Sequence, residues 1–312
     1  MPLRIVFMGT AEFAIPTLNI LLENGYSVPV VVTSPDKPKG RGQELLPTPV
    51  KQRALEAGLT VLQPENLRDP SFADSIRSCS PDLIVVVAFR ILPKEVFTIP
   101  RLGSMNLHAS LLPKYRGAAP INRAIMNGEK ETGVTTFLLD EKVDTGKILL
   151  QARAPIFDSD DAGTVHDKLA EIGAQIVLHS VRLIEQGKAV PRPQDDTLAT
   201  PAPKIFKEDC RIDWNRPAEA VRNQIRGLSP SPAAFTTHEV KVIKIFRASV
   251  VEGKLSPGAV QAGKDFLHVG TGDKLISIEE LQQEGKRRMT IAEFLRGYRL
   301  ADGERLGIES EE

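Results

Sequence analysis

Two polar residues at the end of an apolar run are the first candidates for chemistry. Asn106 and His108 lie two positions apart, so on a strand both side chains point to the same side. An imidazole can take up or release a proton near pH 7, and an asparagine amide can donate a hydrogen bond to a developing oxyanion. The alternative is a buried histidine at a strand end, satisfied by a backbone carbonyl.

A carboxylate further along the chain fits the same chemistry. Asp144 stands shortly before Gly146, in a predicted turn between the strand-like runs 133–138 and 148–156. A carboxylate beside an imidazole can orient the ring and stabilise its cationic form. We therefore expect Asp144 to orient His108, directly or through water.

The surrounding pattern predicts a doubly wound, mainly parallel, Rossmann-like α/β domain. Short apolar runs alternate with helical patterns, and the unbroken run 83–88 is typical of a central parallel strand covered on both faces. A long amphipathic pattern over 162–186 predicts a closing helix. Open sheets of this class bind ligands at the carboxyl ends of their strands, where the segment 106–113 begins.

Prolines mark the boundary of a second domain. Four of them fall within 189–204, a composition that suits an extended linker and excludes a regular helix. Five short strand-like runs between 234 and 281 then predict a small, OB-like β-barrel. We expect a first domain at 1–188, a linker at 189–206 and the barrel at 207–312.

Composition limits the partners. The 312 residues carry 40 basic and 40 acidic side chains, so any contact with nucleic acid must come from a local patch. No apolar run approaches the roughly 18 residues of a membrane span and no signal-peptide pattern opens the chain, so we expect a cytoplasmic protein without a membrane contact. Cys79 and Cys210 have no metal-ligand neighbours, which indicates neither a zinc site nor a disulfide framework.

Together with the intervening run 115–121, the two polar segments resemble the folate-dependent formyltransferases. The family motif reads Asn-x-His-x-Ser-Leu-Leu-Pro, then Arg-Gly, then Asp-x-Gly. The segments 7–14, 35–42 and 226–232 extend the resemblance over nearly the whole chain, to members that formylate methionine carried by initiator tRNA. It implies that 10-formyltetrahydrofolate gives its formyl group to the α-amine of methionyl-tRNA for translation initiation, with no metal, in a monomer whose second domain binds tRNA.

The resemblance also implies roles for single residues. Asn106 stabilises the oxyanion, His108 carries the proton, and Asp144 holds the ring. Folate lies against two short segments, which comprise Ser110, Leu111, Leu112 and Pro113, and Phe89, Arg90 and Ile91. The second segment departs from the family pattern, because 88–93 is one residue short and has arginine at position 90 where glycine is usual.

A basic loop is the candidate tRNA contact. The stretch 36–53 holds five basic and two acidic residues. The resemblance assigns Lys37, Lys39 and Arg41 to the acceptor stem, where phosphate contacts position RNA. The alternative is a solvated surface loop with incidental charge.

Three other functions remain as alternatives. Amino-sugar-nucleotide and glycinamide-ribotide formyltransferases share the Asn-His-Asp set, but the second would normally end after the first domain. Sugar enzymes lack the combination of the loop 37–41 with the element 226–232. A non-catalytic RNA-binding protein on the same scaffold would not need the intact set Asn106, His108 and Asp144.

Overall fold

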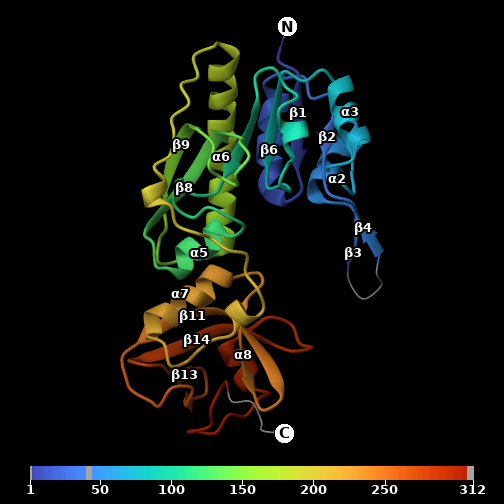
Figure 1. Cartoon of the computed structure of the whole chain (residues 1–312). Helices are drawn as coiled ribbons and strands as arrows, with labels where there is room; N and C mark the ends of the chain where they lie inside the picture. Colours follow the sequence, from blue (N-terminus) through green and yellow to red (C-terminus); the bar gives the residue numbers. More distant parts are fainter. Residues whose placement is uncertain (1, 40–43, 308–312) are drawn as a thin grey trace. The chain divides into compact units, whose positions relative to one another are not determined.

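The computed structural model describes residues 2–39 and 44–307, and its chain divides into two units (Figure 1). The first unit comprises Met1–Gly117, Thr132–Ala154 and His166–Pro201. The second comprises Ala118–Glu131, Pro155–Val165 and Ala202–Glu312. The domain boundaries at residues 188 and 206 stay a prediction.

A seven-stranded sheet organises the first unit, in the order β5-β2-β1-β6-β7-β8-β9. From β5 to β7 the neighbouring strands are parallel, whereas β8 runs antiparallel to β7. The predicted mainly parallel, doubly wound sheet is therefore confirmed. Its strands are β1 (Ile5–Gly9), β2 (Val31–Val32), β5 (Val61–Leu62), β6 (Leu83–Val87), β7 (Ser104–His108), β8 (Glu131–Leu138) and β9 (Ile148–Pro155).

The strand order reverses between β1 and β6. From β1 the chain builds outward through β2 to β5, and it then returns to β6 and builds the other way. Every residue of β1 and β6 is buried, which explains why their sequences are continuous apolar runs. Ligands of such sheets bind beyond the carboxyl ends of the strands near this reversal, which is where β7 ends in His108.

Side-chain caps and prolines mark where two helices of this unit begin. In α2 (Pro49–Glu56) the Thr48 side chain accepts a hydrogen bond from the Lys51 backbone N–H, and proline occupies the first turn. In α3 (Pro70–Ser78) Asp69 caps the first turn in the same way. The remaining helices are α1 (Ile15–Glu23), α4 (Lys94–Phe97) and α6 (Ala162–Glu185). The long helix predicted over 162–186 is α6.

A hairpin lies within the predicted basic loop. The strands β3 (Lys37–Lys39) and β4 (Glu44–Leu46) pair antiparallel before α2 begins. The sequence predicts a loop here, because strands of only three residues are too short to show an alternating apolar pattern.

An antiparallel sheet forms the second unit. Its order is β10-β11-β14-β13-β12, with β15 added to β14. All five predicted strand-like runs are present, and the two-residue β15 was missed. The strands are β10 (Ala234–His238), β11 (Lys241–Val251), β12 (Val260–Ala262), β13 (Leu267–Gly270), β14 (Leu275–Gln283) and β15 (Met289–Thr290), accompanied by α7 (Ala218–Leu228) and α8 (Ile291–Leu295).

Two stretches that precede the proline-rich segment in the chain, Ala118–Glu131 and Pro155–Val165, belong to this second unit. The helix α5 (Pro120–Met126) packs on α7, and the Asn122 side chain donates to the Gly227 carbonyl at 2.7 Å. A β-carbon at Gly227 would lie 2.7 Å from Met126 Cγ, so glycine permits the close approach of the two helices. Across the described residues, no helix is long and apolar enough to span a membrane.

The helix α6 supports β7 through a glycine. A β-carbon at Gly173 would lie 2.6 Å from Leu107 Cδ2, and Leu107 is itself buried between the two polar residues of β7. We expect Gly173→Val to lower the free energy of unfolding by about 1–3 kcal/mol through overpacking. Denaturant titration measures this change.

The matched control is Gly297→Val, because nothing lies within 4 Å of a β-carbon there. That change should stay within about 0.5 kcal/mol. Equal losses in the two variants would contradict the packing argument.

Candidate active site

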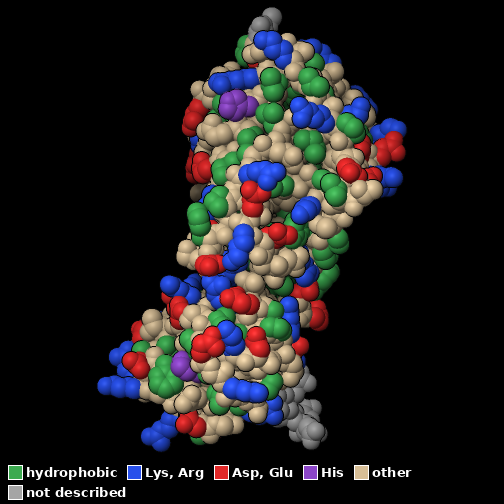
Figure 2. All heavy atoms as spheres, turned by 90° about the vertical axis from the view of Figure 1, so that its left-hand side faces the viewer, with side chains coloured by type: hydrophobic (Ala, Val, Ile, Leu, Met, Phe, Trp, Pro, Cys, Tyr) green, Lys and Arg blue, Asp and Glu red, His purple; other side chains and the backbone are tan. Residues whose placement is uncertain are grey.

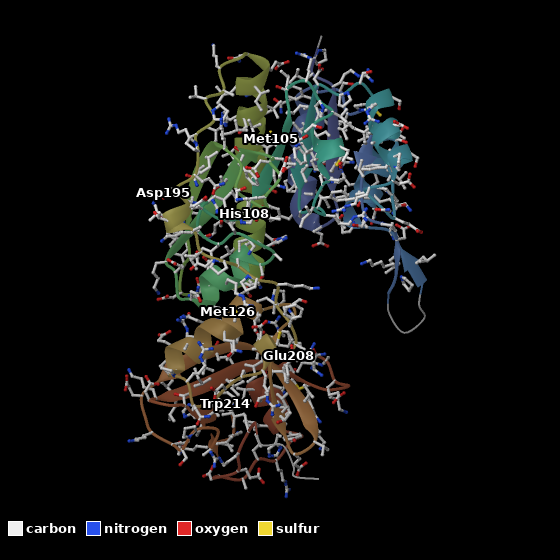
Figure 3. All side chains as sticks on the ribbon, in the orientation of Figure 1. Met105, His108, Met126, Asp195, Glu208 and Trp214 are labelled. Atoms are coloured by element: carbon white, nitrogen blue, oxygen red, sulfur yellow. The ribbon has the colours of Figure 1, made fainter. Side chains whose placement is uncertain are left out.

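The carboxyl end of β7 carries the first two site residues. Because side chains alternate along a strand, Asn106 and His108 project to one side, while Met105 and Leu107 project to the other and are buried. Met105 and His108 are labelled in Figure 3. The His108 side chain is 8% exposed. Because β7 is held between β6 and β8, both polar side chains stand on rigid backbone.

The ring of His108 is fixed from both edges. Its Nε2 lies 2.8 Å from the backbone carbonyl of Tyr115, and its Nδ1 lies 3.7 Å from Asp144 Oδ2. A carbonyl oxygen can only accept, so Nε2 carries the proton of the neutral ring and Nδ1 keeps its lone pair. The alternative interpretation of His108, a histidine satisfied by a backbone carbonyl, therefore holds for Nε2. Nδ1 remains able to accept a proton.

Asp144 reaches His108 from a left-handed turn. Its φ is 55°, and its Oδ2 accepts a hydrogen bond from the Gly117 backbone N–H at 2.9 Å. The 3.7 Å to His108 Nδ1 is longer than a hydrogen bond and within reach of an ion pair. Asp144 is therefore placed to stabilise a cationic ring, whereas the tautomer of the neutral ring is set by Tyr115.

Gly146 explains the spacing of the Asp-x-Gly motif. A β-carbon at this position would lie 1.6 Å from the Leu138 carbonyl oxygen. Only glycine lets the turn after β8 approach the strand this closely, and the turn brings Asp144 to His108.

The Asn106 amide is available to a substrate. Its side chain is partly exposed, and within the described ranges it has no hydrogen-bond partner. An amide held on a strand next to a histidine can donate to an oxygen that gains negative charge during a reaction.

The predicted folate turn after β7 is closed by its own hydrogen bonds. The Ser110 hydroxyl donates to the Lys114 carbonyl at 2.6 Å, and the Thr135 hydroxyl donates to the Ser110 carbonyl at 2.7 Å. Leu112 is buried, and the peptide bond that joins it to Pro113 is cis. Leu111 and Pro113 are partly exposed. Ser110 thus shapes this turn, and its contact with folate stays a prediction.

The other predicted folate segment is held by the arginine that departs from the family pattern. The Arg90 guanidinium donates to the carbonyls of Pro64 at 2.6 Å and Glu65 at 2.9 Å, and it lies 5.3 Å from the centre of the Phe89 ring. Burial lowers the pKa of Arg90 below its usual value. Ile91 is 75% exposed and Phe89 is partly exposed, so both present apolar surface to solvent.

The predicted tRNA residues are only partly described. Lys37 is exposed on β3 and Lys39 ends that strand, whereas Arg41 lies outside the described residues. Two other charges of the stretch pair with each other, because Lys51 contacts Asp36. Hydrogen bonds from Lys51 and Gln63 lower the pKa of the Asp36 carboxyl.

Sequence reasoning missed three polar residues behind the site. Thr135 and Gln151 hold the turn after β7 from β8 and β9, since Thr135 Oγ1 accepts from the Leu112 N–H at 3.1 Å and Gln151 Nε2 donates to the Leu112 carbonyl at 2.8 Å. Gln194 contacts the Asp144 turn from a distant segment. A threonine inside the apolar run of β8 was a usable signal, but nothing in the local pattern indicates Gln194.

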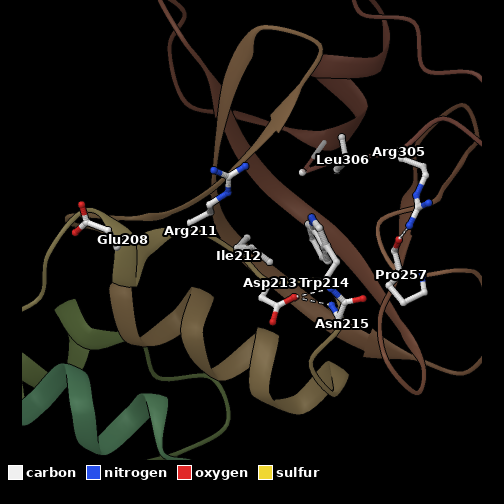
Figure 4. Close-up of a pocket in the computed structure, with 10 residues that line it drawn as sticks. Glu208, Arg211, Ile212, Asp213, Trp214, Asn215, Pro257, Arg305 and Leu306 are labelled. Atoms are coloured by element: carbon white, nitrogen blue, oxygen red, sulfur yellow. Dashed lines mark hydrogen bonds between the residues drawn. The ribbon is translucent and has the colours of Figure 1, made fainter. Parts of the chain in front are cut away.

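A pocket of about 460 Å³ lies in the second unit, and none of the predicted catalytic residues lines it (Figure 4). Trp214 and the polar side chains of Arg211, Asp213, Asn215 and Arg305 line it. Arg305 donates to the Pro257 carbonyl at 2.7 Å, and the Asp213 carboxylate accepts from Asn215. In the part of the chain that the structure describes, no group of three or more His, Cys, Asp or Glu could hold a metal ion.

The solved structures that resemble this chain share its fold. An N-formyltransferase from Helicobacter canadensis, solved with folinic acid and dTDP-3-aminofucose, is 18% identical with a TM-score of 0.67, and the match covers 92% of this chain and 100% of that one. HypX from Aquifex aeolicus with tetrahydrofolic acid is 20% identical with a TM-score of 0.66, over 97% of this chain and 51% of that one.

Sequence comparison is more specific. A methionyl-tRNA formyltransferase from Caldanaerobacter subterraneus subsp. tengcongensis is 50% identical over 96% of this chain and 99% of its own length. One from Bacteroides thetaiotaomicron is 49% identical over 96% and 97%. The family models for formyl transferase and for the formyl transferase C-terminal domain match residues 3–181 and 204–299. The chain therefore belongs to the formyl transferase family.

Proposed function

We propose that this formyltransferase transfers the formyl group of 10-formyltetrahydrofolate to the α-amine of methionine on initiator tRNA. The observation that carries the proposal is the near-full-length similarity, at 48–50% identity, to relatives that are named methionyl-tRNA formyltransferases. Both family domains are matched, at residues 3–181 and 204–299, in keeping with this full-length similarity.

Formyl transfer requires the site to stabilise an oxyanion and to move one proton. The amine nitrogen attacks the formyl carbon and forms a tetrahedral intermediate, whose oxygen carries negative charge. The bond from carbon to N10 then breaks, and N10 takes up the proton that the amine gives away. The site must therefore donate a hydrogen bond to the oxyanion and carry one proton between two nitrogens.

The side chains at the end of β7 can stabilise the oxyanion and carry the proton. The unengaged amide of Asn106 donates to the oxyanion. His108 accepts the amine proton at Nδ1, because Nε2 is committed to the Tyr115 carbonyl. The Asp144 carboxylate, 3.7 Å from Nδ1, stabilises the imidazolium until the proton passes to N10. No covalent intermediate with the protein is needed.

The acceptor decides among the related functions. The protein is incubated with 10-formyltetrahydrofolate and, in parallel, with methionyl-tRNA, an amino-sugar nucleotide or glycinamide ribotide, and the products are analysed by mass. We expect formylation of methionyl-tRNA only. A formylated sugar or ribotide would replace the proposed acceptor, and tRNA binding without formylation would indicate a binding protein.

The proton carrier is tested by substitution. His108→Ala and Asp144→Asn should each lower the single-turnover rate by about 10²–10⁴, the usual contribution of general acid–base groups. Asn106→Ala should lower it by about 10²–10³ through loss of an oxyanion donor. Folate affinity, measured by equilibrium binding, should hold in all three variants. A variant that loses folate affinity but keeps its rate would identify a ground-state binding residue instead.

The tRNA contact is tested through its salt dependence. Arg41→Ala should weaken methionyl-tRNA binding and reduce the slope of log affinity against log salt by about 0.7–0.9 for one lost phosphate contact. Folate affinity should not change. The matched control is Lys188→Ala, which removes an exposed charge far along the chain from the basic stretch. If both variants bind tRNA equally well with equal slopes, the loop is an ordinary solvated surface.

A further inference from the structure

The amide of Gln194 is saturated by contacts with the loops that build the site. Its Nε2 donates to the carbonyls of Asp144 at 2.9 Å and Gly146 at 2.8 Å. Its Oε1 accepts from the Arg116 guanidinium, at 2.7 Å from Nη2 and 3.2 Å from Nε. Both N–H donors and the acceptor oxygen of the side chain are thus engaged.

These contacts converge on the geometry of the Asp144 carboxylate. Asp144 adopts a left-handed backbone, which L residues hold only when their surroundings impose it. Gln194 donates hydrogen bonds to the carbonyls of Asp144 and Gly146, the residues on either side of Thr145, so it fixes the orientation of this turn. It also holds Arg116, and the next residue, Gly117, supplies the N–H that binds Asp144 Oδ2.

The segment that carries Gln194 is itself anchored at both ends. We call residues 192–201 the return segment. At its start, Arg192 exchanges two backbone hydrogen bonds with Ile148, each of 2.8 Å. Near its end, the Thr200 hydroxyl accepts from the Tyr115 N–H and the Thr200 carbonyl accepts from the Arg116 N–H, both at 2.9 Å. Gln194 is therefore presented from a fixed backbone.

The return segment also reaches the other partner of His108. The Tyr115 carbonyl accepts a hydrogen bond from His108 Nε2, and the Tyr115 N–H donates to the Thr200 hydroxyl. The backbone partner of the ring and the carboxylate partner of the ring are thus tied to the same ten residues.

We propose that Gln194 is a positioning residue for formyl transfer, which acts by holding the Asp144 carboxylate beside His108. The inference rests on the proposed function, in which Asp144 stabilises the His108 cation. It adds to that function a residue of the return segment that makes no contact with the reacting atoms.

The chemistry of the amide makes the proposal specific. Glutamate at position 194 has the same length and keeps an acceptor for Arg116, but it loses both donors to the Asp144 and Gly146 carbonyls. Methionine has a similar length and loses every one of these hydrogen bonds. Gln194→Glu therefore separates the anchoring of Arg116 from the positioning of Asp144.

The experiment compares Gln194→Glu, Gln194→Met, Asp144→Asn and the double variant Gln194→Glu/Asp144→Asn. Single-turnover formylation of methionyl-tRNA and folate binding are measured for each, together with the melting temperature. The matched control is Gln261→Met, which changes an exposed glutamine on β12. We expect Gln194→Glu and Gln194→Met each to lower the rate about 10–10²-fold at unchanged folate affinity, because a small misplacement of a catalytic group has this effect.

The double variant distinguishes positioning from general destabilisation. If Gln194 acts through Asp144, Gln194→Glu should cost less than threefold once Asp144 is asparagine, since effects through one shared partner are not additive. Full additivity, or wild-type rates in Gln194→Glu, overturns the proposal. If Gln194→Met melts early, Gln194→Glu still decides, because it retains the Arg116 contact.

A spectroscopic measurement keeps this inference separate from the proposed function. With ¹⁵N-labelled histidine, the ring resonances of His108, assigned through His108→Ala, should shift in Gln194→Glu and Asp144→Asn but not in Gln261→Met. Should the wild-type protein leave methionyl-tRNA unformylated, the proposed function fails, and the ring resonances alone then decide whether Gln194 positions Asp144. Unshifted His108 resonances in Gln194→Glu overturn the inference in either case.

Discussion

The site depends on a turn that only glycine permits. The chain after β8 must fold back over Leu138 so closely that position 146 has no room for a β-carbon, and this approach carries Asp144 into the left-handed backbone from which it faces His108. Without the turn, the histidine would keep its carbonyl partner and lose its carboxylate. The sheet holds β7 between β6 and β8, and the return segment holds this turn through Gln194.

The direction of β8 also matters. Because β8 pairs antiparallel with β7, Thr135 stands directly opposite His108. Thr135 can then accept from the Leu112 N–H and donate to the Ser110 carbonyl, which closes the turn after β7 from the side of the sheet. This one strand, between β7 and β9, thus supports the predicted folate turn and leads into the Asp144 turn.

The sequence predicts the elements that have a periodic apolar pattern and the residues that belong to a motif. It does not predict contacts between side chains and distant backbone. The continuous apolar run of β6 and the amphipathic run of α6 are visible because burial on a sheet or along a helix face repeats with a fixed period. The pair of His108 and Asp144 was accessible through motif spacing. Gln194 was not, because a side-chain amide that binds backbone carbonyls about fifty positions away leaves no periodic trace. The same holds for Arg90, whose sequence context indicated a departure from the family pattern but not its contacts with residues 64 and 65.

Some basic side chains of this chain are buried and bind protein backbone, whereas others are exposed, and this difference bears on the proposed contact with tRNA. Lys and Arg are interspersed with Asp and Glu on the surface in Figure 2, in keeping with equal totals of 40. Arg226 belongs to an element that carries the family resemblance, but it is buried and donates to the carbonyls of Phe157 and Asp160. Burial lowers the pKa of Arg226, and its bonds fix the stretch 157–160 within the second unit. Its part in the element 226–232 is therefore to hold protein backbone, so a phosphate contact in this unit must come from exposed basic side chains.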